Sequence, residues 1–258
     1  MQPQQPPHTS KLDNRPRILC LHGGGVNSKI FETQSRVLIR QLPDFRLCFA
    51  DAPFLSSAGP GILPIYQEWG PYRSWLRLTS IHAEGQDEAI IRQVRSCVER
   101  CKTNDAGTGP WVGILGFSQG GKVAASILYD QQIRREKDGP AVEEDFKFGV
   151  IMAARAPLVS MCEYSLSPAL ATPTTAASSG GFTLPSPHIL RIPTIHVHGL
   201  QDEGLPMHRQ LAAEYCSEAS RTIIEWEGDH TIPIKMGDTT RIAQSIYKVA
   251  RQQGVLTI

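Results

Sequence analysis

The sequence G-F-S-Q-G, residues 116–120, is the feature that most restricts how this chain can fold. It follows an apolar run that begins at Trp111 and precedes a segment of helical character that begins at Lys122. The pattern predicts a strand, a very tight turn and a helix, with glycines beside Ser118 because the pinched backbone has no room for a Cβ atom. Such a turn holds the serine hydroxyl at the end of a strand, where it can act as a nucleophile. A solvated serine in an ordinary glycine-rich turn is the alternative.

Five further apolar runs resemble buried strands, at residues 17–22, 46–51, 146–152, 192–199 and 221–226. Each is followed by a turn and most by a helical pattern. This alternation predicts a single α/β domain with a mostly parallel sheet of about six strands and helices on both faces. The 258 residues, of which 41% are hydrophobic, suffice for the core of one such domain.

Two segments depart from this alternation. Residues 1–16 are rich in Gln and Pro and lack the apolar stretch of a secretory signal, so we predict a disordered tail and a folded domain over 17–258. Residues 160–187 are small and polar and include T-P-T-T-A-A-S-S-G-G. We predict a flexible insertion or a lid there.

Charge and composition exclude several functional classes. The net charge is +1 without a run of like charges, which argues against a nucleic-acid-binding surface. No apolar run approaches the roughly 20 residues of a membrane span. A cytoplasmic location is the default, and six cysteines fit it as thiols. Cys97 and Cys101, or His196 and His198, have the spacing of a ligand pair but no companion ligands, so we expect no metal and no cofactor.

Three polar residues follow the ends of three predicted strands, in the order Ser118, Asp202, His230. The ends of parallel strands meet at one edge of the sheet, so these side chains are expected to converge there. A serine needs a base within hydrogen-bond reach, which His230 would provide, and Asp202 would orient the imidazole. We therefore predict these three as catalytic residues. The alternatives are a helix-capping Asp202 and a surface His230; Asp51 is a competing acid that we expect instead to order a turn.

Two backbone N–H groups are predicted to stabilise an oxyanion. One belongs to Gln119, next to the nucleophile at the start of a helix. The other comes from the turn H-G-G-G at 22–25, with Gly24 as first choice and Gly25 as second. An ordinary strand-to-helix turn is the alternative for this stretch, and His22 is expected to be structural.

The segment at residues 52–78 is irregular in pattern but rich in large apolar residues, so it must pack onto the domain or a ligand. It leaves the sheet on the active-site side. We predict that it forms one wall of an acyl pocket, and burial for stability alone is the alternative. The predicted pocket residues are Phe54, Ile62, Trp69, Tyr72 and Trp75. Arg155, just past another strand end, is a lesser candidate to face the site or bind a carboxylate.

Several motifs together resemble the small fungal serine hydrolases, and more narrowly the lovastatin-pathway thioesterase (LovG) family. They are G-F-S-Q-G, L-H-G-G-G-V-N-S-K-I-F, D-A-P-F, G-P-G-I-L-P, W-G-P-Y-R-S-W and H-V-H-G-L-Q-D-E. The resemblance covers residues 17–252. It implies an α/β-hydrolase fold, a triad at Ser118, Asp202 and His230, and hydrolysis of an acyl thioester, often a polyketide on a synthase's acyl carrier protein. Asp229 departs from the family, and its carboxylate is a candidate to raise the pKa of His230.

Two other functions stay open at this point. A carboxylesterase acting on small oxyesters needs the same triad and oxyanion hole, so the sequence does not separate it from a thioesterase. The second is a ligand-binding protein that has the hydrolase fold but does not turn over a substrate.

Overall fold

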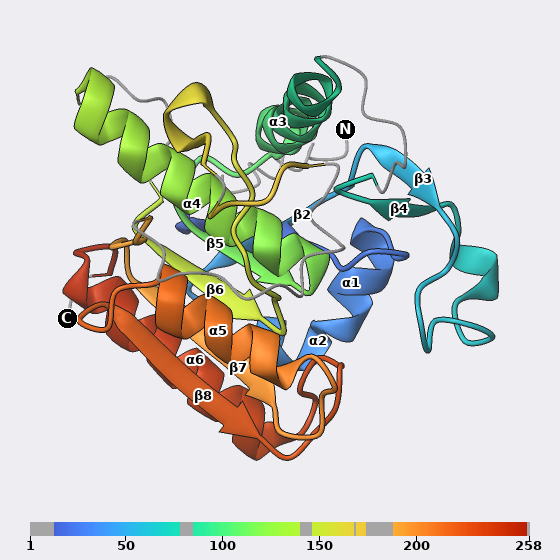
Figure 1. Ribbon diagram of the computed structural model, residues 1–258. Helices are drawn as coiled ribbons and strands as arrows, with labels where there is room; N and C mark the ends of the chain where they lie inside the picture. Colours follow the sequence, from blue (N-terminus) through green and yellow to red (C-terminus); the bar gives the residue numbers. More distant parts are fainter. Residues whose placement is uncertain (1–12, 78–84, 140–145, 168, 174–187, 257–258) are drawn as a thin grey trace, which may run out of the picture.

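The computed structural model describes residues 13–77, 85–139, 146–167, 169–173 and 188–256 (Figure 1). Six parallel strands form its central sheet, in the order β2-β1-β5-β6-β7-β8. These strands are β1 (Arg17–Leu21), β2 (Arg46–Ala50), β5 (Trp111–Phe117), β6 (Phe148–Met152), β7 (Thr194–Gly199) and β8 (Arg221–Trp226). The predicted α/β fold with six parallel strands is confirmed.

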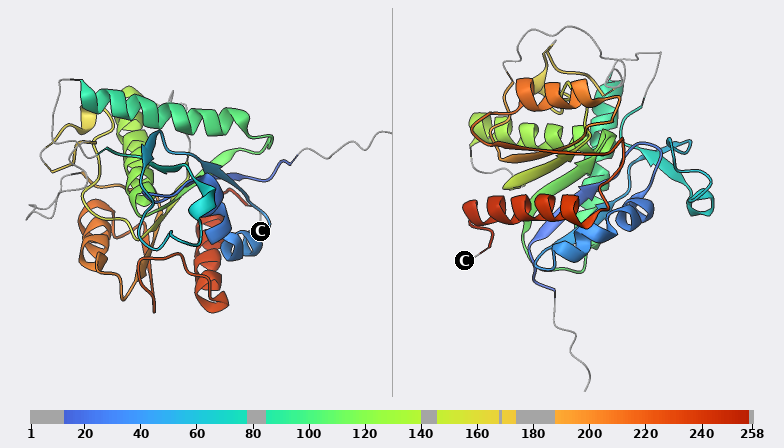
Figure 2. Two further views of the ribbon diagram at one scale, coloured as in Figure 1. Left: turned by 90° about the vertical axis from the view of Figure 1, so that its right-hand side faces the viewer. Right: turned by 90° about the horizontal axis from the view of Figure 1, so that it is seen from below.

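Helices cover both faces of the sheet, with α3, α4 and α5 on one face and α1, α2 and α6 on the other (Figure 2). Their bounds are α1 (Ser28–Gln34), α2 (Arg36–Gln41), α3 (Gln86–Asn104), α4 (Gln119–Asp138), α5 (Leu205–Tyr215) and α6 (Met236–Gln252), with 3₁₀ turns η1 (Gln67–Trp69) and η2 (Glu163–Ser165). No helix within the described ranges is long and apolar enough to cross a membrane.

The central strand β1 shows why the sheet is buried on both faces. Leu19 and Leu21 contribute to the core beneath α3, α4 and α5, while Ile18 and Cys20 contribute to the core beneath α1, α2 and α6. Successive side chains of a strand point to opposite faces, so an uninterrupted apolar run is what a doubly covered strand requires.

The strand order also fixes where a ligand can bind. The chain moves from β1 outward to β2, then returns across β1 to β5 and continues outward in the other direction. The loops that follow β1 and β5 therefore leave the sheet toward opposite sides. This divergence opens a crevice at the carboxyl ends of the strands, which is the usual ligand site of doubly wound sheets.

The segment at residues 52–77 leaves the sheet after β2 and forms a small antiparallel hairpin of β3 (Phe54–Ser56) and β4 (Tyr72–Ser74). Backbone hydrogen bonds attach it to the glycine turn after β1. The N–H of Gly25 donates to Arg73 O at 2.9 Å, the N–H of Arg73 donates to Val26 O at 2.7 Å, and the N–H of Gly59 donates to Gly25 O at 2.9 Å.

The two predicted irregular segments are more ordered, where described, than their composition suggested. Four residues of the predicted tail, 13–16, contact the domain, since Thr108 N–H donates to Asp13 O at 2.8 Å. Residues 160–167 and 169–173 follow β6 as a packed loop, with Met161 and Leu170 in the core beneath α4. The few apolar side chains of this stretch pack into the core and hold it in place. The mainly polar composition of the stretch did not indicate this packing. The remainder of both predictions, residues 1–12 and 174–187, lies outside the described residues.

Candidate active site

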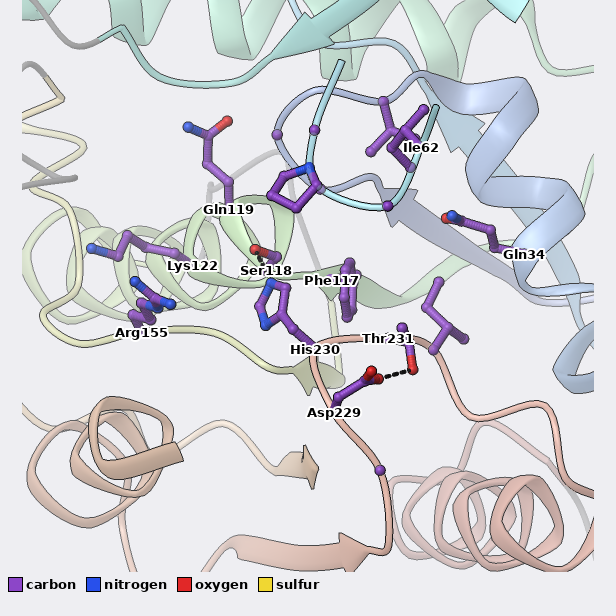
Figure 3. A pocket seen from close by; sticks show the side chains of 18 of the residues that line it. Gln34, Ile62, Phe117, Ser118, Gln119, Lys122, Arg155, Asp229, His230 and Thr231 are labelled. Atoms are coloured by element: carbon purple, nitrogen blue, oxygen red, sulfur yellow. Dashed lines mark hydrogen bonds between the residues drawn. The ribbon is translucent and has the colours of Figure 1, made fainter. Parts of the chain in front are cut away.

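Ser118 occupies the tight turn between β5 and α4. Its backbone angles are φ 54° and ψ −118°, a region that costs a non-glycine residue free energy and persists only when the surroundings enforce it. Two hydrogen bonds do so: the N–H of Ser118 donates to Met152 O at 2.8 Å, and the N–H of Lys122 donates to Ser118 O at 3.0 Å. The turn points the hydroxyl away from the sheet and into the crevice (Figure 3).

The two glycines of the motif are packing requirements. A Cβ atom on Gly116 would lie 2.2 Å from Gly120 O, and one on Gly120 would lie 2.2 Å from Leu21 O. Their absence allows the start of α4 to lie directly against β5 and β1. The two glycines of the G-x-S-x-G pattern are therefore needed because β5, β1 and the start of α4 approach one another closely at Ser118.

The structure brings Ser118, His230 and Asp202 into one chain of hydrogen bonds. His230 Nε2 lies 2.9 Å from Ser118 Oγ, a contact drawn in Figure 3, and His230 Nδ1 lies 2.6 Å from Asp202 Oδ2. A carboxylate only accepts hydrogen bonds, so Nδ1 carries the imidazole proton and donates it. Nε2 is then an acceptor facing the serine hydroxyl, which is the arrangement a general base needs.

Asp202 is held as a buried anion. Its side chain is 1% exposed, and its Oδ1 accepts the N–H of Gly204 at 2.8 Å. Burial by itself raises the pKa of Asp202, but the hydrogen bonds from Gly204 and His230 outweigh burial and hold that pKa below its usual value. The carboxylate therefore stays charged at neutral pH and can stabilise an imidazolium.

A column of histidines continues from His230 into the core. The ring centroids of His230, His208, His198 and His196 follow one another at 6.0, 5.9 and 6.0 Å. Burial lowers the pKa of His208 to about 4, so this ring is neutral beside Asp202, whose Oδ2 lies 3.8 Å from His208 Nδ1.

Asp202, His208 and His230 are also close enough together to be considered as metal ligands. The contact between Asp202 Oδ2 and His230 Nδ1 is 2.6 Å, whereas two ligands of one tetrahedral zinc ion lie about 3.3 Å apart. A shared proton fits this spacing better than a shared ion.

Gln119 and Gly24 flank the Ser118 hydroxyl as oxyanion candidates. Gln119 is the first residue of α4, so its N–H is one of the donors that a helix leaves unpaired at its start. The N–H of Gly24 has no acceptor among the described residues. Gly25, the second choice, is excluded because its N–H donates to Arg73 O. The Gln119 side chain packs beside Gly24 and accepts the N–H of Trp75 at 2.7 Å. The packing contact keeps the two residues that carry the candidate donors next to each other.

A cavity of about 970 Å³ opens at Ser118. One part of its wall is apolar and includes Ile62, Tyr66, Trp226, Ile232 and Ile234. Ile62, one of the residues predicted to line an acyl pocket, lies in this wall. The volume is in the range of sites for small molecules and suits an acyl chain of moderate length.

The other four predicted pocket residues do not line the cavity. Trp75 is fully buried, and its Nε1–H donates to His22 O at 2.8 Å. Phe54 is buried in the core beneath Arg77, whose guanidinium lies 4.6 Å from the ring. Trp69 and Tyr72 pack around a small cluster that contains Ile62. An irregular segment has few backbone hydrogen bonds of its own, so most of its large side chains are used to hold it in place.

Two residues weighed from the sequence have structural roles. His22 is buried, accepts the N–H of Ala52 on Nε2 at 3.1 Å, and burial lowers its pKa to about 4. This confirms the structural role expected for it. Asp51 is exposed and accepts the N–H of Ser28 at 2.8 Å, so it caps the start of α1 rather than its own loop.

The structure adds residues that the sequence analysis missed. Lys122 and Met207 line the cavity, and His208 lies against the triad. Lys122 follows Ser118 by four positions in a helix, a spacing that indicates a shared face and so could have revealed it. Arg155, which the sequence made a lesser candidate to face the site, lines the cavity. Asp229 accepts a hydrogen bond from the hydroxyl of Thr231 at 2.7 Å (Figure 3).

A serine on such a turn, hydrogen-bonded to a histidine at the switch point of a parallel sheet, defines a serine hydrolase of the α/β-hydrolase fold. The chain belongs to the serine hydrolase (FSH1) family, whose sequence model matches residues 12–242.

Curated relatives agree with this assignment. The chain is 48% identical to the esterase citA of Monascus ruber over 248 residues, which are 93% of this chain and 94% of that protein. It is 42% identical to the esterase claE of Penicillium crustosum, covering 96% and 98% of the two chains. The resemblance to fungal serine hydrolases is therefore confirmed.

Solved structures share the fold at low sequence identity. Zea mays acyl-protein thioesterase 2 matches with a TM-score of 0.55 and 15% identity, covering 93% of this chain and 95% of that one. A carboxylesterase from Mesorhizobium loti matches with a TM-score of 0.53 and 15% identity, covering 92% and 90%. At this identity the likeness supports the fold alone.

Proposed function

We propose that this serine hydrolase cleaves acyl thioesters through a covalent acyl-enzyme and releases a polyketide-type acyl chain from a synthase's carrier protein. Ser118 is the nucleophile, His230 the general base and acid, and Asp202 the residue that orients His230. The observation that carries the proposal is the unbroken hydrogen-bond chain from Asp202 Oδ2 through His230 to Ser118 Oγ, at 2.6 and 2.9 Å.

The chemistry follows from these atoms. As Ser118 Oγ attacks the acyl carbon, His230 Nε2 takes the hydroxyl proton and Asp202 stabilises the resulting imidazolium. The N–H groups of Gln119 and Gly24 donate to the oxyanion, at typically ~3 kcal/mol for each donor. The tetrahedral intermediate collapses, the thiol leaves with the proton from His230, and water attacks the acyl-enzyme in a second round with the same groups.

The thioester part of the proposal is supported by the position of a family motif. Residues 59–62, the G-P-G-I portion of G-P-G-I-L-P, line the cavity beside Ser118. This motif and D-A-P-F are the two most specific parts of the resemblance to the lovastatin-pathway thioesterase family. We also propose that the partner is a carrier protein and that the enzyme acts in the cytoplasm.

Oxyester hydrolysis is a second candidate, because the curated relatives are named esterases. A thiolate leaves more readily than an alkoxide, but both reactions use the same groups. Comparing kcat/KM for S-ethyl and O-ethyl esters of one acyl chain separates the two. A strong preference for the oxyester would reject the thioesterase assignment.

Turnover itself is tested with a fluorophosphonate probe, which reacts covalently with an activated serine. We expect the wild-type protein to be labelled and Ser118→Ala to remain unlabelled, with Ser57→Ala, an exposed serine outside the cavity, as a labelled control. A wild-type protein that resists the probe would instead support a ligand-binding module without turnover.

The carrier-protein partner needs its own measurement. We expect an acyl chain on a carrier protein to be hydrolysed with a higher kcat/KM than the same chain on free pantetheine. Equal values for the two substrates would mean that no carrier-protein surface is recognised, and that the substrate is a small thioester.

A further inference from the structure

His208 is a buried polar side chain for which the proposed mechanism has no role. It is 0% exposed and belongs to the buried face of α5, together with Leu211, Ala212 and Tyr215. Neither of its ring nitrogens has a hydrogen-bond partner among the described residues. Buried polar atoms nearly always have such a partner, and an apolar side chain would fill this place without the cost of an unpaired one. The packing of α5 therefore does not explain why this residue is a histidine.

The first turn of α5 holds His208 in a fixed position relative to the catalytic acid. The N–H of Leu205 donates to Asp202 O at 2.9 Å, and the N–H of His208 donates to Gly204 O at 3.1 Å. Asp202 Oδ1 accepts the N–H of Gly204, which leaves Oδ2 for His230. His208 Nδ1 lies 3.8 Å from this same Oδ2. Two imidazole rings therefore face one carboxylate oxygen, one within hydrogen-bond distance and one beyond it.

The charges around His208 favour one tautomer of its ring. Nδ1 faces the carboxylate of Asp202, which can only accept a hydrogen bond. Nε2 and the guanidinium of Arg155 both approach Gly204, since a Cβ atom there would lie 2.8 Å from His208 Nε2 and 2.8 Å from Arg155 Nε. An N–H is stabilised by a nearby anion and a lone pair by a nearby cation. The ring proton therefore belongs on Nδ1.

A neutral ring at this place leaves the charge of Asp202 to His230. Burial lowers the pKa of His208 to about 4, although the charge of Asp202 acts in the opposite direction. The neighbouring His198, His230 and Arg155 add to the lowering. A charged ring would form an ion pair with Asp202 and compete with the imidazolium that catalysis forms on His230. An uncharged N–H attracts the carboxylate oxygen without forming an ion pair.

We infer that His208 is a positioning residue of the triad, whose Nδ1–H attracts Asp202 Oδ2 and so restrains the carboxylate in the orientation that His230 requires. This inference rests on the proposed hydrolase function and adds a residue to its machinery. His208 is not among the described residues that line the cavity, so it acts through Asp202 rather than on a substrate. The 3.8 Å contact can shorten during the reaction, since catalytic hydrogen bonds often tighten only in the substrate complex.

Two substitutions of nearly equal shape distinguish a hydrogen-bond donor from a side chain that only fills space. Asn and Leu both branch at Cγ, and the NH₂ group of Asn can occupy the place of the histidine Nδ1. His208→Asn therefore keeps a donor near Asp202 Oδ2, whereas His208→Leu removes it. The control is His196→Leu, because His196 is also buried but lies at the far end of the histidine column. Melting temperatures establish that the three variants are folded.

The rate constant for fluorophosphonate labelling of Ser118 reports the activated serine without knowledge of the natural substrate. We expect His208→Leu to lower this rate constant about tenfold, and to lower kcat for an S-ethyl thioester about tenfold while KM stays nearly constant. His208→Asn should keep both values within about threefold of the wild type, and His196→Leu within about twofold. Rescue by the amide, together with a change in kcat rather than KM, is what a positioning role requires.

A second readout does not depend on turnover. In the ¹H NMR spectrum a hydrogen bond as short as 2.6 Å to a carboxylate moves the Nδ1 proton of His230 to low field. Its absence from His230→Ala identifies this resonance. We expect it in the wild type and in His208→Asn, and we expect it to be lost or shifted to higher field in His208→Leu, where the carboxylate is less restrained.

The results separate this inference from the proposed function. A labelling rate constant for His208→Leu within twofold of the wild type would overturn the positioning role and leave the hydrolase intact. Equal losses in His208→Leu and His208→Asn, or an equal loss in His196→Leu, would also overturn it, because the residue would then only fill space. A wild-type protein that resists the fluorophosphonate would overturn the hydrolase assignment instead. In that case an identical resonance in both His208 variants would still reject the restraint on Asp202.

Discussion

Replacing Asp202 with asparagine changes one atom of the site and tests its proton arrangement directly. Asp202 Oδ1 accepts the N–H of Gly204 at 2.8 Å, and Oδ2 accepts Nδ1–H of His230 at 2.6 Å. In the variant only the amide oxygen can accept, and the Gly204 N–H needs an acceptor because it is buried at that position. The amide NH₂ must then occupy the Oδ2 position, where it donates to Nδ1 of His230.

This donation reverses the tautomer of the imidazole. With Nδ1 accepting, the ring proton moves to Nε2, which faces Ser118 Oγ at 2.9 Å and can no longer take its proton. In Ser-His-Asp hydrolases a misplaced tautomer of this kind lowers kcat about 10⁴-fold, which corresponds to about 5.5 kcal/mol of transition-state stabilisation. We expect a loss of that size for Asp202→Asn, with circular dichroism unchanged because the two side chains have the same shape.

The assay is the steady-state rate of thiol release at saturating substrate, with Asp51→Asn as the matched control. Asp51 is the other acid considered from the sequence, and it only caps α1 at Ser28, so we expect its kcat to change less than twofold. A variant at residue 202 that kept more than about a tenth of the wild-type kcat would refute the reasoning. A large loss at Asp51 would mean that the acid had been wrongly chosen.

Three further predictions concern stability. Ser118→Gly should abolish turnover yet raise the melting temperature by about 2–4 °C, because glycine tolerates φ 54° and relief of that strain is worth about 1 kcal/mol; differential scanning fluorimetry showing a lower value would contradict this. Gly120→Ala should destabilise the protein by at least about 2 kcal/mol in urea unfolding, since its Cβ would lie 2.2 Å from a backbone oxygen. Gly237→Ala, whose Cβ in α6 meets nothing within 4 Å, is the control and should be neutral or stabilising. For His22 the folded pKa of about 4 lies below the usual 6.5, so the unfolded chain takes up a proton first as pH falls. The free energy of unfolding should therefore decrease by about 3 kcal/mol from this residue between pH 6.5 and pH 4, and equal stability at both ends of that window would reject the assignment of His22 as a neutral, buried ring.

The sequence was sufficient to predict the sheet, and to predict that Ser118, Asp202 and His230 lie close together at one edge of it. Both predictions depend on local patterns, because apolar runs of strand length report burial and the ends of parallel strands share one edge. The residues of the cavity wall depend instead on the path of irregular segments. Trp75 was predicted to line the pocket, but it faces inward and binds the carbonyl of His22, a contact between residues 53 positions apart. No local pattern contains that information.

Two other features could not be read from the sequence for different reasons. His208 reaches Asp202 only because the first turn of α5 folds back over the loop that carries the acid. Arg155 and Lys122 belong to different elements, so their common charge becomes visible only when β6 and α4 are placed side by side. A separation of four residues from Ser118 predicts the face of α4 on which Lys122 lies. It does not predict that Arg155 lies near the same face.

The hydrogen bonds among Gly25, Gly59 and Arg73 have a consequence for anyone who wishes to redesign this enzyme. They join the peripheral hairpin to the same short turn that carries Gly24, the proposed oxyanion donor. Grafting a foreign hairpin to alter chain-length preference would therefore disturb catalysis at the same time. Diversification is best confined to the tip at residues 60–66, where side chains reach the cavity without sharing those backbone attachments.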